Sequence, residues 1–188
     1  MGDELLLESL QEFYGRGTYG EQLLSVVNGE SRISLRSIDW FITNYSKKHN
    51  TYYLVHETRE GFPTNEQQGI RTRNFNVHQS YKSQLKAYSK RRFDPFCRRE
   101  RISFPVTGGS VETTIGQLNF FRWALANGVT MYIIENKKEI EDDMNACLKE
   151  IKLKSSKKNG KRKKREELSL SATRGLSRTN IAVELTFD

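Results

Sequence analysis

The sequence predicts an α+β fold in which helices pack on a small, mainly antiparallel sheet. Several stretches repeat apolar residues at three- and four-residue spacing, which is typical of amphipathic helices. Others alternate apolar and polar residues or are rich in β-branched and aromatic residues, which favours strands. A run of nine Lys and Arg residues without an acid, residues 152–165, precedes one last alternating stretch. The predicted parts are an acidic N-terminal segment (1–30), an α+β core (31–152), a basic flexible linker (153–179) and a C-terminal β-strand (180–188).

The helices follow from apolar periodicity and from residues that begin or end a helix. Thr113 or Thr114 is expected to cap one helix, which ends near Asn127-Gly128. Pro95 disfavours a helical conformation at Asp94 and so ends another helix near Phe93. Helices are predicted at residues 1–13, 21–27, 35–45, 79–93, 115–127 and 129–152.

The helix after Ser34 raises a separate question about Trp40. Leu35, Ile38, Phe41 and Tyr45 form the apolar face of this helix, and Trp40 falls nearly opposite them. Trp40 therefore either packs against a second layer or faces a partner, and it is a candidate interface aromatic.

Three strands are expected to form the sheet. They are residues 51–57, 101–106 and 180–187. FNV (75–77) is a further short strand, TGGS (107–110) is a hairpin turn, and residues 61–69 form a loop. The last strand follows the basic linker, so it either completes the sheet of its own chain or adds to that of a neighbour.

The composition limits the class of protein. A chain of 188 residues fits one domain, and its hydrophobic content of 36% is low. The longest apolar runs are too short or too charged to span a bilayer. The start, MGDELLLESLQEF, is acidic and does not have the pattern of a signal peptide. The two cysteines show no disulfide or metal spacing, so a reducing, intracellular setting is expected.

Charge is unevenly distributed along this chain of net charge +8 and pI 9.5. Residues 1–30 hold six acids against one basic residue, whereas residues 71–101 hold ten Lys and Arg against two acids. This asymmetry predicts an anionic partner, but it does not distinguish between nucleic acid, a membrane and a protein as that partner.

The sequence predicts no enzyme, no cofactor and no metal site. The histidines His49, His56 and His78 have no paired ligand spacing, and TGGS lacks the Lys of a phosphate-binding loop. The acids at positions 135–143 are expected on the solvent face of a helix. Cys97 has basic neighbours that favour a thiolate, but no base is evident beside it.

Basic residues are the strongest candidates for a binding site. Arginine and lysine bind phosphate and carboxylate alike. The alternative is a solvated face whose charge is balanced by the acidic helix or the acidic N-terminus. Tyr81, Tyr88, Phe93 and Phe96 are interpreted as base-stacking platforms or, for the two tyrosines, as core residues. The candidates are Lys82, Lys86, Lys90, Arg91, Arg92, Arg98, Arg99 and Arg101, followed by Lys161, Arg162, Lys163, Lys164 and Arg165.

The segment KRRFDPFCRRER (90–101) is predicted to be a basic rim held by an aromatic hinge. KRR closes a helix, Asp94-Pro95 turns the backbone, and RRER leads into a strand. Phe93 and Phe96 are expected to fix this corner in the core.

Four stretches of the sequence carry a resemblance to a known family. They are IDWFITNYSKKHN (38–50), YKSQLKAYSKRRFDPFCRRERISF (81–104), TTIGQLNFFRWALANGV (113–129) and KRKKREELSLSATRG (161–175). From about residue 38 onward, the chain resembles short proteins encoded by nucleocytoplasmic large DNA viruses of the phycodnavirus and mimivirus type. The resemblance implies a small virion-associated protein and gives no catalytic residues.

Two functions follow as expectations. The first is a minor capsid protein of a large icosahedral DNA virus, whose basic residues meet acidic surfaces of neighbouring capsid proteins in a multi-subunit assembly. The second is a viral protein that binds DNA or RNA in genome packaging or late transcription. Either function implies localisation in the virion, and in the host cytoplasm (the virus factory) during assembly.

Overall fold

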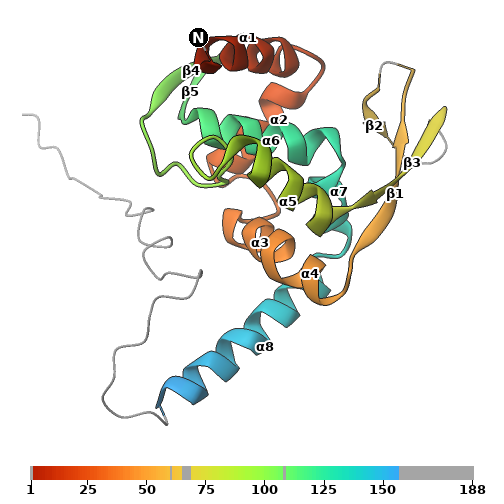
Figure 1. The fold of residues 1–188 in the computed structure, drawn as a ribbon, viewed down its shortest axis with the longest axis vertical. Coiled ribbons are helices and arrows are strands. Elements are labelled where there is room, and N and C mark those ends of the chain that lie inside the picture. Colours follow the sequence, from red (N-terminus) through yellow and green to blue (C-terminus); the bar gives the residue numbers. More distant parts are fainter. Residues whose placement is uncertain (1, 60, 65–68, 108, 157–188) are drawn as a thin grey trace, which may run out of the picture.

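The computed structural model describes residues 2–59, 61–64, 69–107 and 109–156. A helical body carries a three-stranded sheet on one side and a β-hairpin beside the N-terminal helix, and helix α8 projects away from the body (Figure 1). Helices combined with small antiparallel sheets confirm the α+β prediction. The predicted C-terminal strand at 180–187 lies outside the described residues, as does most of the basic linker.

The first thirty residues are part of the core. They form α1 (Gly2–Tyr14) and α2 (Tyr19–Val27), from which Leu10 and Leu23 are completely buried. The Tyr14 hydroxyl donates a hydrogen bond to the Leu118 carbonyl of α6 (Ile115–Ala126) at 2.7 Å. The apolar faces of α1 and α2 thus pack on the body.

A wide helical turn follows α3 (Leu35–Trp40). Ser34 caps α3 by accepting a hydrogen bond from the Ser37 amide at 3.0 Å. The chain then forms a π-helix, η1 (Phe41–Tyr45), and a last turn, α4 (Ser46–Lys48). A π-helical turn holds more residues than an α-helical turn, which shifts the side chains that follow it. Tyr45, at the end of this turn, is buried as its place on the apolar face predicts, and Asn44 is half-buried.

The larger sheet has the antiparallel order β2-β1-β3. Tyr53 lies opposite Phe75 on the face that packs against the body, whereas Tyr52 and Leu54 are exposed on the other face. The helix α5 (Val77–Tyr88) starts directly after β3, and the Asn76 side chain accepts a hydrogen bond from the Gln79 amide. The strands are β1 (Tyr52–Glu57), β2 (Pro63–Thr64) and β3 (Arg71–Asn76).

The predicted strand at 101–106 belongs to a second, separate sheet. It is β4 (Ile102–Val106), which forms a hairpin with β5 (Gly109–Thr113). The expectation that 51–57 and 101–106 share one sheet was wrong. The turn at 107–110 was predicted, but its second strand was not, because that strand is short and has only Val111 and Thr113 buried.

The C-terminal half of the described chain contains three helices. Helix α6 is buried over most of its surface and forms the centre of the core. Gly128 adopts a left-handed conformation (φ 64°) between α6 and α7 (Val129–Glu135), a conformation that glycine adopts without strain. The helix predicted at 129–152 is divided at Asn136 into α7 and α8 (Lys137–Ser156). None of the described helices is both long and apolar enough to cross a bilayer.

Thr114 is the cap of α6, as one of the two alternatives predicted. Its hydroxyl oxygen accepts a hydrogen bond from the Gln117 amide at 3.1 Å. We expect Thr114→Ala to lower the free energy of unfolding by about 1 kcal/mol, because an amide of the first helical turn loses its partner. Urea denaturation measures the difference. Thr113→Val is not a neutral control, since the Thr113 hydroxyl donates to Gln117 Oε1; Thr107→Ala, at the exposed hairpin turn, is the better one.

Candidate functional site

The segment 89–101 is a loop fixed to the start of α6. Helix α5 ends at Tyr88, earlier than predicted, where Ser89 turns the backbone with φ 57°. Phe93 is 1% exposed and contacts the rings of Phe120 and Trp123. The side chains of α6 also bind the loop backbone: Gln117 donates to the Pro95 carbonyl and Asn119 to the Arg92 carbonyl, both at 2.9 Å.

The aromatic hinge was predicted correctly for Phe93 but not for Phe96. Phe96 is only half-buried, and the Arg98 guanidinium lies over its ring at 4.4 Å from the centroid. Gly116 explains how closely the loop approaches α6, because a Cβ at this position would lie 3.0 Å from the Arg91 carbonyl oxygen. Tyr81 is a core residue, since its ring contacts Phe93 and Trp123.

Three of the predicted basic residues are held by acids of the same chain. Arg92 Nε lies 2.6 Å from Asp3 Oδ1 of α1, and Arg101 Nη1 lies 2.5 Å from Glu112 Oε1 across the β4–β5 hairpin. Arg98 pairs more loosely with Asp94, at 3.7 Å. These guanidinium groups have intramolecular partners, which partly supports the alternative of internally balanced charge.

Four of the predicted residues remain exposed and form no ion pair with another described residue. They are Lys82 and Lys86 on α5, Arg91 in the turn after it, and Arg99 before β4. Lys82 and Lys86 are one turn apart and share a helix face. Lys90 is also exposed. The residues Lys161, Arg162, Lys163, Lys164 and Arg165 lie outside the described residues.

Electrostatic contacts divide these cations into two groups. The charges of Lys82 and Lys47 both lower the pKa of His78, so Lys47 of α4 lies near the cations of α5. We call Lys47, Lys82 and Lys86 the α5 basic group. Lys90, Arg98 and Arg99 all act on Asp94, and we call them the Asp94 basic group. Burial raises the pKa of Asp94, and these cations oppose that shift. Lys47 was missed in the sequence because its proximity to α5 depends on the packing of α4.

The predicted acidic face is only partly solvated: Glu135, Glu139 and Asp142 are exposed, as predicted, whereas Asp143 and Glu141 are partly buried. Three of these acids accept hydrogen bonds from α3 and η1. The Trp40 indole donates to Asp143 Oδ2 at 3.0 Å, and the Tyr45 hydroxyl donates to Glu139 Oε1 at 2.5 Å. Glu141 accepts a longer hydrogen bond from Ser37 at 3.4 Å. These contacts join α8 to α3 and η1.

Trp40 is therefore a packing residue and not an interface aromatic. It is 3% exposed, because α8 covers the helix face opposite the apolar stripe. Asp143 also pairs with Lys48, and its carboxylate is 3.8 Å from His49 Nε2. Burial alone would raise the pKa of Asp143, but the hydrogen bonds from Lys48 and Trp40 outweigh burial and hold the pKa below its ordinary value.

We expect Asp143→Asn to lower the free energy of unfolding at neutral pH by about 1–3 kcal/mol, because two donors lose a charged acceptor. Since the folded-state pKa is depressed, this stabilisation is present above the ordinary pKa of 3.8 and is lost as the pH falls through the folded-state value. Denaturation at neutral and at acidic pH tests both statements. Asp142→Asn, at the exposed neighbouring acid, is the matched control and should change stability by less than about 0.5 kcal/mol.

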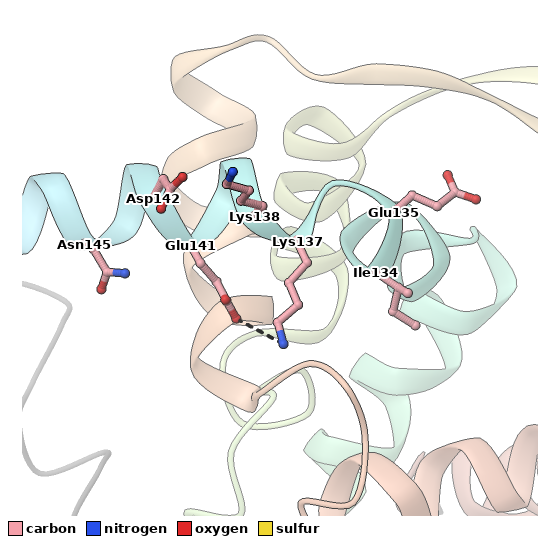
Figure 2. Close-up of a pocket in the computed structure, with 7 residues that line it drawn as sticks. All are labelled: Ile134, Glu135, Lys137, Lys138, Glu141, Asp142 and Asn145. Carbon is pink, nitrogen blue, oxygen red and sulfur yellow. Dashed lines mark ion pairs between the residues drawn. The ribbon is translucent and has the colours of Figure 1, made fainter.

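The acids at the α7–α8 junction do not converge. Figure 2 shows Glu141 pointing toward Lys137, whose Nζ is 3.8 Å from Glu141 Oε1, while Glu135 and Asp142 point elsewhere. Within the part of the chain that the structure describes, no three His, Cys, Asp or Glu side chains are grouped to hold a metal ion.

The thiol of Cys97 does not have the lowered pKa that its basic neighbours predicted. Burial raises the pKa of its thiol, and this outweighs the nearby Arg101, so the basic neighbours do not produce a thiolate.

The fold and its surface define a small α+β protein in which several exposed cations lie on α5 and the loop that follows. The chain belongs to a family described as "Family of unknown function (DUF7197)", whose model matches residues 1–185. The match includes the N-terminal helices, which the resemblance noted from residue 38 onward did not cover.

One relative comes from Acanthamoeba polyphaga mimivirus and is described as "Uncharacterized protein L507". It is 38% identical over 154 residues, which are 78% of this chain and 55% of the relative. The chain thus spans about half the length of the relative it matches. This homologue supports a viral origin and a family found in giant viruses. No solved structure matches this fold.

Proposed function

We propose that this protein binds nucleic acid in a giant virus, through phosphate contacts made by the exposed cations of α5, the following loop and the basic run at 161–165. Its role is genome packaging or late transcription, without catalysis of its own. The phosphate backbone supplies most of the affinity of such proteins, and Lys and Arg are the residues that neutralise it.

The exposure of the cations supports this proposal. Lys82, Lys86 and Arg91 are exposed and form no ion pair with another described residue, whereas Asp143 is bound by donors of α3 and α4. These cations are therefore available to an external anion.

The aromatic residues determine the expected mode of binding. Tyr81 and Phe93 pack in the core, and Arg98 covers the ring of Phe96. Since these rings do not offer exposed faces for base stacking, binding is expected to be directed to the backbone and to depend little on sequence.

Fluorescence anisotropy with labelled duplex DNA and single-stranded RNA tests the proposal. The full chain should bind both, and the logarithm of the binding constant should fall linearly with the logarithm of salt concentration, because each phosphate contact releases counterions. Absence of binding at physiological salt, or an affinity that does not depend on salt, would contradict the proposal.

A second candidate is a minor capsid protein in contact with other capsid proteins. Exposed apolar residues at the larger sheet favour it: Tyr52 and Leu54 of β1 are 69% and 54% exposed, and Ile70, just before β3, is 59% exposed. Exposed apolar groups on one face are typical of protein-binding surfaces. This candidate places the protein in the virion and, during assembly, in the host cytoplasm. Mass spectrometry of genome-free particles separates the two functions, since only a capsid protein should be present there at stoichiometric copy number.

A further inference from the structure

A hollow lined by aromatic rings lies where η1, β1, α7 and α8 meet. Its volume is about 270 Å³, and it is lined by the rings of Tyr45, Tyr52, Tyr132 and His49 together with the Glu139 carboxylate. These residues come from four elements, so the fold and not a local motif brings them together. None of them belongs to the basic groups described above.

The rings are held in place by their neighbours. The Tyr45 ring contacts that of His49 in a tilted arrangement, with ring centroids 4.3 Å apart, and its hydroxyl donates to Glu139. Tyr132 is stacked on Tyr53, with centroids 4.7 Å apart. Tyr52 is 69% exposed, and His49 and Glu139 are exposed as well. The held rings of Tyr45 and Tyr132 would therefore offer a ligand a preformed part of the site.

The hollow carries negative charge beside neutral rings. Burial, followed by contacts with Glu139, raises the pKa of Tyr45; burial and the charges of Glu139 and Glu135 raise the pKa of Tyr132. Both phenols are thus neutral at physiological pH. The negative charges that raise the pKa of Tyr132 come from two carboxylates, Glu139 and Glu135. Lys48, in the turn after η1, is paired with Asp143.

Aromatic faces combined with a carboxylate attract a cation. We propose that this hollow binds a lysine or arginine side chain of the basic run KKNGKRKKR (157–165) of a second copy of this chain. The run holds seven basic residues in nine and no acid, which complements the carboxylates of the hollow. The proposal does not depend on nucleic-acid binding.

The length of chain between the two sites favours a second copy over the same chain. Along α8, Glu139 and Ser156 are 17 residues apart, a distance of about 25 Å. The Cα of Lys161, five residues beyond Ser156, can be at most about 18 Å from it, so Lys161 falls short of the hollow of its own chain unless its side chain is extended as well. The later basic residues of the run reach that far only with the chain close to fully extended. A second copy has no such limit.

Sedimentation equilibrium of the nuclease-treated full chain tests the proposal. The wild-type protein should self-associate at low salt and dissociate as salt screens the contact. Two variants should each associate about tenfold or more weakly. The first is the hollow variant, Tyr52→Ser with Glu139→Gln. The second is the tail variant, in which Lys161, Arg162, Lys163, Lys164 and Arg165 are replaced by Ser.

Mixing the two variants gives the sharpest result. Each lacks a different half of the contact, so each should be monomeric alone, while the mixture should form a one-to-one complex. A matched control, Leu54→Ser with Glu21→Gln, removes one exposed apolar residue and one exposed acid elsewhere and should associate like the wild type.

Three results would overturn the proposal: a wild-type protein that stays monomeric at low salt, a control that loses association as strongly as the hollow variant, or a mixture that stays monomeric. DNA binding provides a separate readout. The hollow variant should bind DNA like the wild type, so failure of self-association and failure of the proposed function are distinguishable.

Discussion

Charge reversal at four exposed cations is expected to lower the affinity for duplex DNA by on the order of 100-fold or more at low salt. The change replaces Lys82, Lys86, Arg91 and Arg99 by Glu. These side chains are exposed and form no ion pair with another described residue, so their reversal should affect binding and leave the folded state intact. The slope of the logarithm of affinity against the logarithm of salt should also fall, by about 3.6 if all four contact phosphates.

The matched control has the same change in net charge at other places on the surface. If it weakens binding as much as the four-residue variant does, the attraction depends on net charge alone and the assignment of this surface is wrong. Circular dichroism of both proteins checks that the fold is retained. The control replaces four exposed residues by Glu: Arg32, Arg59, Lys138 and Lys149.

Phe93→Ala is expected to cost about 3–5 kcal/mol of the free energy of unfolding, the range typical of removing a buried phenylalanine. Phe93 is 1% exposed and contacts Tyr81, Phe120 and Trp123. Its loss leaves a cavity at the point where the loop 89–101 is fixed to α6. Urea denaturation monitored by tryptophan fluorescence measures the effect, because Trp123 lies in the same cluster.

Phe96→Ala is the internal control for this prediction. It changes the second phenylalanine of the same FDPF sequence, but that ring is half-buried beneath Arg98. We expect a cost of about 1 kcal/mol, from one cation–π contact and partial burial. Equal effects at the two positions would show that Phe93 is not the residue that fixes the loop.

Features controlled by neighbouring residues were predictable from the sequence. Thr114 as a cap and the end of α6 near Asn127-Gly128 depend on local backbone geometry, and the structure confirms both. Phe93 as an anchor followed from an aromatic residue before a proline-induced turn. In each case the signal lies within a few residues of the feature it determines.

Features controlled by packing between distant segments were not predictable. Trp40 and Asp143 are 103 residues apart in sequence, and only the docking of α8 on α3 shows that both are internal. The pairing of Arg92 with Asp3 likewise depends on where α1 lies. A helical pattern in the sequence identifies the faces of a helix but does not show which face another element covers. The charged residues of a single segment were therefore predicted to be more exposed than they are.

The length of α8 has a consequence for how strongly a long polyanion would be held. The helix spans about 30 Å and projects from the body, so its C-terminal end, to which the basic run is joined, lies away from α5 (Figure 1). Two weak sites joined in this way act as a bivalent ligand: once one site is bound, the effective concentration of the other is high. Short oligonucleotides that reach only one site would miss this gain, whereas longer ones would show avidity.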